Sequence, residues 1–464
     1  MRIMSEVHVK KLAATESVCP VCLKLLPAAV VSRGNEVVLE KTCEDHGSWQ
    51  TPIWRGGPSY QEWQRPKTPA HPKLTCTRVM DGCPYDCGLC PEHRQNPCSV
   101  LLEVTQKCSL GCPVCFANSK ATAAAETDPS LAVIEDWYGR VMAAAGPCNI
   151  QLSGGEPTMR DDLGEIIALG RKHGFTFIQL NTNGLRLAQE AGYAQQLAKA
   201  GLTTVFLQFD GLDERIHQQL RGRPLALQKL TAIERCGAAG LGVVLVPTLV
   251  PGVNTEDIGA IIRFALDKVP LVRGVHFQPI SYFGRFAEGP SPGKRFTLPQ
   301  VMQAIEAQTD GLIQASDFIP PGTEHARCSF HCSFMILPNG RLRRISSSSG
   351  SCCNSEDGRQ GLLKTIDSMA RQWSAVPGGQ ARSRPIVGED RTMDLDAFLE
   401  MASNHSLSIS CMAFQDAWNL DLERLRDCCI SIMSPAGNLI PFCAYNLTGQ
   451  YGKSLYRNRQ ESSS

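Results

Sequence analysis

Residues 101–115 read Leu101-Leu-Glu-Val-Thr105-Gln-Lys-Cys108-Ser-Leu-Gly-Cys112-Pro-Val-Cys115, a short apolar run followed by a loop with three cysteines. The apolar run predicts a buried strand, so the loop hangs from the strand's carboxyl end. Thiolates are the usual ligands of a [4Fe–4S] cluster, and a tight loop can bring three of them to one cube. No fourth cysteine is near, since the next is Cys148. One iron is therefore expected to lack a protein ligand and to be open to the amino and carboxylate groups of a cofactor.

A glycine-rich run follows the next predicted strand. It reads Ser153-Gly154-Gly155-Glu156-Pro157-Thr158. Glycines let a backbone approach a ligand closely, and Glu156 can accept a hydrogen bond from a cationic amino group. Most Gly-Gly pairs are only turns, but the position one strand after the three-cysteine loop makes this run a strong functional signal.

Short apolar strands alternate with helical segments between residues 101 and 290. The predicted helices include Asp162–His173 and Tyr193–Ala200. The predicted strands are Leu101–Thr105, Asn149–Ser153, Thr176–Asn181, Thr203–Phe209, Gly242–Thr248 and Gly274–Pro279. Near-continuous apolar strands with intervening helices predict an α/β fold with a parallel sheet. Six units predict a partial (β/α)6 barrel with its site at the carboxyl ends of the strands.

These motifs resemble the radical S-adenosylmethionine (SAM) superfamily over residues 99–290. By that resemblance, Cys108, Cys112 and Cys115 hold a cluster that cleaves SAM to a 5′-deoxyadenosyl radical. The resemblance also implies a set of SAM contacts: Gly154, Gly155, Glu156 and Pro157 near the methionine amino group, Asn181 and Asn183 near the ribose, and Gln208 and Asp210 after the fourth strand. For the last two pairs, a polar strand end with a helix cap is an equally good interpretation.

A second set of cysteines repeats the same spacing upstream. Cys83, Cys87 and Cys90 are followed eight residues later by Cys98. Four thiols predict a closed auxiliary [4Fe–4S] cluster, which can relay electrons to the radical cluster. A zinc knuckle is the alternative, because Cys-x2-Cys serves both metals.

Two knuckles near the N-terminus, Cys19-x2-Cys22 and Cys43-x2-His46, are 20 residues apart and suit one tetrahedral metal. Zinc is the default metal, and a rubredoxin-like iron competes with it. If His46 is only a turn residue, Cys76 could supply the fourth ligand.

The C-terminal segment holds further cysteines. Cys411, Cys428 and Cys443 could meet at another auxiliary cluster, with Cys328 or Cys332 as the fourth ligand; three buried, unligated cysteines are the alternative. Phe414, Trp418, Leu422 and Leu425 recur at helical spacing, and Cys429–Ser434 with Leu439–Tyr445 predict a hairpin. Loops are expected over Ile345–Gly361 and Ser374–Arg391. The expected domains are a metal-knuckle module (1–64), an auxiliary cluster segment (74–98), the barrel (99–290) and a C-terminal iron–sulfur domain (291–464).

The composition of the chain excludes several classes of function. The 464 residues carry a net charge of +1 with 20% charged residues, which gives no electrostatic case for nucleic acid. No apolar run is long enough to span a bilayer, and the N-terminus lacks the apolar core of a signal peptide. A cytoplasmic protein is therefore expected. In that setting 21 cysteines indicate metal binding more than disulfides.

Several strings point inside the superfamily: Cys19-Pro-Val-Cys22, Cys43-Glu-Asp-His-Gly47, Gly82-Cys-Pro-Tyr-Asp-Cys-Gly-Leu-Cys-Pro91, Cys112-Pro-Val-Cys-Phe-Ala117 and Ile440-Pro-Phe-Cys-Ala-Tyr-Asn446. Together they resemble the tetraether lipid synthase family, whose relatives include radical SAM methyltransferases acting on a pterin. The resemblance implies three [4Fe–4S] clusters, a mononuclear iron, and hydrogen abstraction from an unactivated alkyl carbon followed by carbon–carbon coupling of lipid chains. A flavodoxin or ferredoxin would supply electrons, and a lipid substrate would bring peripheral membrane contact.

Three other functions stay open beside lipid coupling. They are methyl transfer to a pterin or another small molecule, modification of a peptide, and a non-catalytic iron–sulfur protein. The chain departs from the expected pattern at Cys428-Cys-Ile-Ser431, and residues 320–400 match nothing recognisable. The substrate is therefore the least determined part of the prediction.

Overall fold

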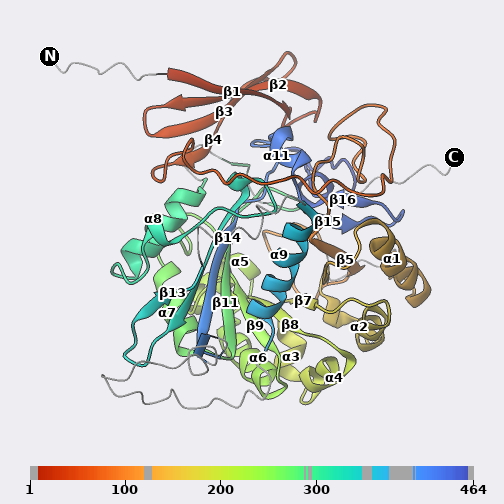
Figure 1. Ribbon diagram of the computed structural model, residues 1–464, viewed down its shortest axis with the longest axis vertical. Helices are drawn as coiled ribbons and strands as arrows, with labels where there is room; N and C mark the ends of the chain where they lie inside the picture. The colour runs from red at the N-terminus through yellow and green to blue at the C-terminus, as the bar shows by residue number, and fades with distance from the viewer. Residues whose placement is uncertain are drawn as a thin grey trace.

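The computed structural model describes residues 9–119, 128–286, 289–290, 295–346, 358–375, 401–402 and 404–457. Its N-terminal module is a four-stranded antiparallel sheet that lies at one end of the molecule (Figure 1). The strands are β1 (Val9–Val18), β2 (Leu25–Arg33), β3 (Glu36–Cys43) and β4 (Gly47–Arg55). Val37 and Leu39 point into the core from one face of β3. The module is thus a small β-sheet as well as a pair of metal knuckles.

The predicted parallel strands are confirmed, with ends shifted by one or two residues. They are β5 (Ser99–Thr105), β6 (Asn149–Gly154), β7 (Ile178–Thr182), β8 (Thr204–Gln208), β9 (Gly242–Val246) and β11 (Val272–Pro279). They pair in chain order, all in parallel. Short β10 (Thr248–Leu249) joins β11. All seven residues of β5 are buried, as expected for a strand covered on both faces.

Helices pack around the outside of this curved sheet (Figure 1). They are α1 (Leu131–Ala144), α2 (Leu163–Lys172), α3 (Leu185–Gln189), α4 (Tyr193–Ala200), α5 (Glu214–Arg221), α6 (Ala226–Ala238), α7 (Ile258–Asp267) and α8 (Leu298–Gln308). In contrast, α9 (Gly358–Trp373) lies on the inner side of the sheet, where Trp373 packs against Phe206 of β8 and His276 of β11. The two helices predicted from sequence correspond to α2 and α4. Ile166 and Ile167 of α2 are fully buried in the main core, as the apolar face of an amphipathic helix should be.

Segments beyond residue 290 extend the same sheet, contrary to the expectation of a separate C-terminal domain. At one edge β14 (Ser406–Met412) pairs in parallel with β11, followed by β12 (Ser329–Ile336) and β13 (Leu342–Arg344). At the other edge β15 (Ile430–Met433) pairs in parallel with β5 and antiparallel with β16 (Leu439–Pro441). These strands cover the edges that a six-stranded partial barrel would leave unpaired.

The predicted hairpin is confirmed by β15 and β16, after which α12 (Phe442–Tyr445) ends the segment. The helix predicted from Phe414 is wrong over most of its length, because only α11 (Leu422–Arg426) is helical. Asp416 instead organises a turn, accepting hydrogen bonds from the backbone of Trp418 and Tyr282. Most of the two expected loops lies outside the described residues. Within the described chain, no helix combines the length and apolarity required to cross a membrane.

Candidate functional site

The three-cysteine loop packs beyond the carboxyl end of β5. Cys108, Cys112 and Cys115 gather around Leu110, Leu185 and Leu225. Burial raises the pKa of the Cys108 thiol to about 12. Arg285 holds the loop from the far side of the barrel: its backbone exchanges two hydrogen bonds of 2.9 Å with Cys115, and its Nε donates to the Cys112 carbonyl at 2.9 Å. Sequence reasoning missed Arg285, since no local pattern links it to this loop.

The glycine-rich run lies directly against this loop. The backbone amide of Gly155 donates to the Thr105 carbonyl and that of Glu156 to the Lys107 carbonyl, both at 2.8 Å. A Cβ atom on Gly154 would lie 2.1 Å from the Thr105 oxygen, and one on Gly155 would lie 2.2 Å from the Lys107 oxygen. The glycines are therefore required where two backbone segments meet, which is a different reason from the ligand approach expected from sequence.

The Glu156 side chain is occupied by the protein itself. Its carboxylate accepts hydrogen bonds from the Thr158 amide and hydroxyl, the Thr182 hydroxyl and the Asn183 amide, at 2.7–3.1 Å. Glu156 thus joins the ends of β6 and β7. Pro157, predicted as a contact, starts a short 3-10 helix and does not line the cavity described below.

Asn181, on β7, and Asn183, just after it, both line the cavity. Asn183 donates to the Ser109 hydroxyl at 3.1 Å and accepts from the Leu185 amide at 2.9 Å, so it ties the turn before α3 to the three-cysteine loop. Asn181 donates to Gln151 at 3.2 Å, and Gln151 donates to Ser99 at 2.8 Å. The result is a chain of amide and hydroxyl groups across the barrel interior.

Arg221 is a site residue that sequence reasoning missed. Asp210, predicted as a contact, is fully buried and absent from the cavity lining; it binds the Arg221 guanidinium through two hydrogen bonds of 2.7 Å. Arg221 itself lines the cavity and hydrogen-bonds the Cys112 thiol. Gln208 also lines the cavity and accepts from Lys229, whose pKa burial lowers to about 8. Asp210 therefore acts through Arg221, which lies eleven positions later at the end of α5.

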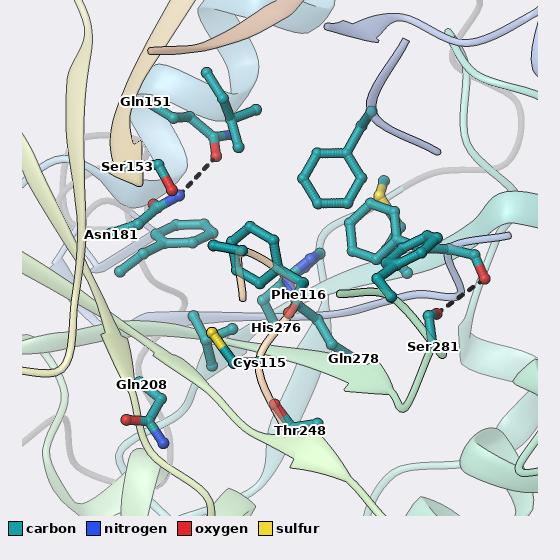
Figure 2. A pocket seen from close by; sticks show the side chains of 18 of the residues that line it. Cys115, Phe116, Gln151, Ser153, Asn181, Gln208, Thr248, His276, Gln278 and Ser281 are labelled. Carbon is teal, nitrogen blue, oxygen red and sulfur yellow. Dashed lines mark hydrogen bonds between the residues drawn. The ribbon is translucent and has the colours of Figure 1, made fainter. Parts of the chain in front are cut away.

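A cavity of about 300 Å³ runs through the barrel from this loop. Figure 2 shows Gln151, Ser153, Asn181, Gln208 and Gln278 directed into it, with aromatic rings between them. The lining combines polar and aromatic groups. Further polar residues are Thr248, His276 and Ser281, and the aromatic residues include Phe116, Phe206, Phe283, Trp373, Phe414 and Phe442. Such a lining suits a planar, hydrogen-bonding ligand.

The donor set at the mouth of this cavity fits a site-differentiated cluster. Three thiols from one loop face the cavity, and the only other thiols in its described lining, Cys98 and Cys429, lie at the opposite end of β5. A cube held there would have one iron directed at the cavity. Arg221 beside it offers a guanidinium, which pairs well with a carboxylate such as that of methionine.

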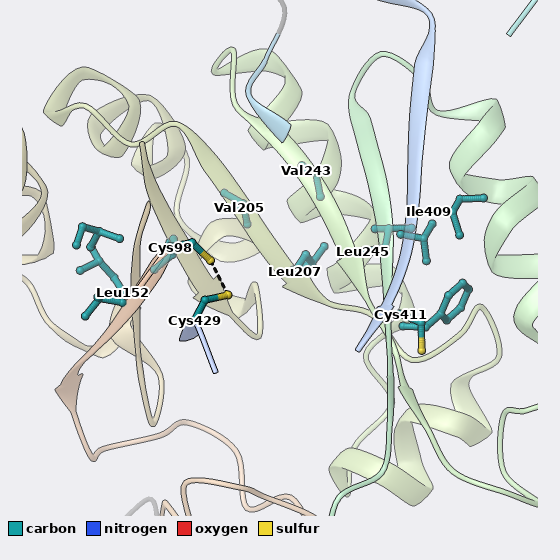
Figure 3. Packing of buried hydrophobic residues seen from close by; sticks show 14 of the residues in the cluster. Cys98, Leu152, Val205, Leu207, Val243, Leu245, Ile409, Cys411 and Cys429 are labelled. Carbon is teal, nitrogen blue, oxygen red and sulfur yellow. Dashed lines mark hydrogen bonds between the residues drawn. The ribbon is translucent and has the colours of Figure 1, made fainter. Parts of the chain in front are cut away.

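Cys83, Cys87 and Cys90 line a small separate cavity beside Leu425 and Arg426, which is consistent with one cluster. Cys98 is not there, and its assignment as the fourth ligand is wrong. Its thiol lies 3.0 Å from that of Cys429 (Figure 3), and its backbone amide donates to the Cys429 carbonyl. The chain between Cys90 and Cys98 enters the central sheet, which carries Cys98 away from the knuckle.

Three of the C-terminal cysteines come together. The Cys328 thiol accepts from Arg424 at 3.4 Å, and the Cys443 thiol accepts from the Gln415 amide at 3.3 Å. Burial raises the pKa of Cys428, and the nearby Cys443 and Cys328 add to that effect. Cys411 does not join them: it lies in the main core on β14, apart from Cys98 and Cys429 in Figure 3. The alternative ligand, Cys332, is also in that core.

The N-terminal metal set is brought together as predicted. Ligand atoms of Cys19, Cys22, Cys43 and His46 all lie within 4.8 Å of one another. His46 Nδ1 is 3.4 Å from the Cys43 thiol and 3.7 Å from that of Cys19, and its hydrogen bond lowers the pKa of Cys43. The alternative ligand, Cys76, is not part of this group. The geometry suits one tetrahedral ion.

Replacing Cys43 by Ser should remove one equivalent of zinc or iron per chain, because three ligands hold the ion far more weakly than four. Elemental analysis of the purified variant measures this directly. Cys76→Ser is the matched control and should keep the full metal content. Equal metal content in all three proteins would contradict the assignment.

Comparisons with known proteins agree with this geometry. Residues 102–265 match the family model of the radical SAM superfamily, and residues 11–55 match the HMPTM N-terminal zinc ribbon domain. The sequence is 31% identical over 196 residues to GTP 3′,8-cyclase of Paenarthrobacter nicotinovorans, covering 42% of this chain and 54% of the cyclase. SuiB of Streptococcus suis gives a TM-score of 0.39 at 18% identity over 47% of this chain and 46% of SuiB, a likeness too low to support a further conclusion. The barrel, the three-thiol loop and the family match define a radical SAM enzyme.

One relative is similar along almost the whole chain. It is the 7,8-dihydro-6-hydroxymethylpterin dimethyltransferase of Methanocaldococcus jannaschii, 34% identical over 479 aligned positions, covering 93% of each chain. The protein therefore belongs to the same radical SAM family as this dimethyltransferase. The expected lipid-coupling activity gains no support from these comparisons.

Proposed function

We propose that the protein is a radical SAM methyltransferase whose substrate is a reduced pterin or a closely similar nitrogen-rich bicycle. When bound, the cluster and SAM supply a 5′-deoxyadenosyl radical. The methyl carbon would come from SAM or from a folate-like donor. The alternative in which a lipid chain is the substrate is less well supported.

The main evidence for this proposal is the polarity of the side chains that line the cavity. Gln151, Asn181 and Gln278 project amides among aromatic rings (Figure 2). Gln151 and Asn181 bond to each other and Gln151 to Ser99, whereas no described group bonds the Gln278 side chain. An alkyl chain packed there would leave the Gln278 amide unpaired, at a cost of about 1–3 kcal/mol. A pterin offers ring nitrogens and a carbonyl to such groups and flat faces to the rings. The similarity to a pterin dimethyltransferase points to the same substrate class.

Other side chains have clear roles in this proposal. The Cys108 loop and Arg221 would position SAM at the mouth, and the aromatic rings would exclude water from the radical. The thiols of the Cys83 loop would hold a cluster through which a flavodoxin or ferredoxin delivers electrons.

The function is tested by anaerobic product analysis. Reconstituted protein with dithionite, SAM and 7,8-dihydro-6-hydroxymethylpterin should release 5′-deoxyadenosine and give a pterin heavier by one or two methylene units. Cys108→Ala should give neither product, because it removes a cluster ligand. Turnover of SAM by the wild type with an unchanged pterin would contradict the proposal.

A further inference from the structure

Two carboxylates line the main cavity, and they differ in their surroundings. Glu156 is held by four protein donors, as described above. Glu324, which precedes β12, accepts hydrogen bonds from the Ser329 hydroxyl at 2.6 Å and the Thr323 hydroxyl at 2.8 Å. In the described part of the chain no lysine or arginine forms an ion pair with it. Each carboxylate oxygen can accept more than one hydrogen bond, so Glu324 retains acceptor capacity toward the cavity.

The groups around Glu324 do not neutralise it. The charge of Glu324 acts on His276 and His331, and burial lowers the pKa of each to about 4, which leaves both neutral at pH 7. The Cys429 thiol lies 3.7 Å from the second carboxylate oxygen. A thiol is a weak donor and cannot replace a cation. Glu324 is therefore a carboxylate at a cavity wall without a cationic partner among the described residues.

Glu324 lies beside the start of β5, whereas the three-cysteine loop follows the end of that strand. It contacts Cys429, and the next residue, Ile430, pairs with Ser99 at the start of β5. Cys108 follows the other end of β5, whose seven residues span roughly 20 Å. That length accommodates SAM near the loop and a bicyclic substrate beyond it.

Three aromatic rings that pack together, one of them that of His276, also line the cavity. The ring centroids of Phe206 and Trp373 are 4.9 Å apart, and each is about 6 Å from that of His276, at 5.9 and 6.3 Å. All three rings line the cavity, and His276 is close enough for the Glu324 charge to act on its pKa. The site therefore combines ring surfaces with one carboxylate.

We propose that Glu324 is the specificity residue that binds the 2-amino-4-oxopyrimidine edge of the pterin. This edge presents a ring N–H and an exocyclic amino group side by side, which match the two oxygens of a carboxylate. The substituted ring of the pterin then faces the Cys108 loop. The inference rests on the proposed function and adds the group that selects the substrate and sets its orientation.

The test compares two ligands and two variants. Binding is measured on the anaerobic, cluster-loaded enzyme with SAM and without reductant, using 7,8-dihydro-6-hydroxymethylpterin and its 2,4-dioxo analogue, in which a carbonyl replaces the amino group. The wild type should bind the 2-amino compound at least about tenfold more tightly than the 2,4-dioxo analogue, since in the analogue a second carbonyl faces the carboxylate. Glu324→Gln should bind the 2-amino compound roughly 10–100-fold more weakly than the wild type does. It should also lose most of the preference for this compound over the analogue, because the glutamine amide can donate to the second carbonyl of the analogue. Glu234→Gln, on the exposed outer face of α6, is the matched control and should match the wild type.

Iron content and reductant-dependent SAM cleavage show whether each variant is intact. Equal wild-type affinity for the two ligands overturns the inference, even if the variant fails to fold. Loss of iron in Glu324→Gln also overturns it, since Glu324 would then support a cluster. If the wild type binds and methylates 7,8-dihydro-6-hydroxymethylpterin while Glu324→Gln binds it with wild-type affinity, only this inference fails. If the wild type cleaves SAM but binds neither ligand, the proposed function fails.

Discussion

Gly155→Ala should lower the melting temperature of the protein by at least about 3 °C and strongly reduce its iron content. The new methyl carbon would lie 2.2 Å from the Lys107 carbonyl oxygen, where no rotamer change can relieve the contact. One backbone segment must move, at a cost of at least about 3 kcal/mol. That movement breaks the hydrogen bond from Gly155 to Thr105 and displaces the Cys108 loop.

Gly111→Ala, in the adjacent three-cysteine loop, is the control, since its added carbon would meet no protein atom within 4 Å. Scanning calorimetry and iron analysis after anaerobic reconstitution measure both effects. Similar results for the two variants would show that the close approach of the two backbones is not what the glycines provide.

Arg221→Met should weaken SAM binding roughly 10–100-fold and also destabilise the fold. The guanidinium and Asp210 form a buried pair, and removal of one partner leaves an uncompensated charge, which costs about 3–5 kcal/mol. The loss of SAM affinity has a separate cause, because Arg221 faces the cavity beside Cys112.

A double variant separates these causes. Arg221→Met with Asp210→Leu replaces the pair with apolar groups and should recover most of the stability while SAM binding stays weak. Equilibrium dialysis with labelled SAM and thermal denaturation give the two measurements. Recovery of SAM affinity together with stability would mean that Arg221 is structural only.

The barrel could be predicted because its strands carry their own signal. Runs such as residues 100–102 in β5 and Gly242–Val246 in β9 are apolar and alternate with amphipathic helices, so local sequence is enough. The sheet edges could not be predicted in the same way. The β12 strand mixes polar and apolar residues, and its place is set by pairing with β14, which lies some 75 positions later in the chain.

Site residues could be predicted from sequence where they share one loop. They could not be predicted where residues distant in the chain are brought together by the tertiary fold. Cys108, Cys112 and Cys115 fall within eight residues, so spacing alone brings them together. Cys98 has an equally suitable spacing from Cys90, yet its thiol meets one 331 residues away. Arg221 and Glu324 face the cavity because of long-range packing, and no motif marks them.

The most direct test of the whole account is which substrate stimulates SAM cleavage. The reduced, cluster-loaded enzyme is given SAM with either 7,8-dihydro-6-hydroxymethylpterin or a dialkyl lipid deuterated along its chains, and 5′-deoxyadenosine is followed by mass spectrometry. We expect faster 5′-deoxyadenosine formation and a methylated product with the pterin, and no deuterium transfer from the lipid. Deuterium from the alkyl chains in 5′-deoxyadenosine, with no effect of the pterin, would contradict it.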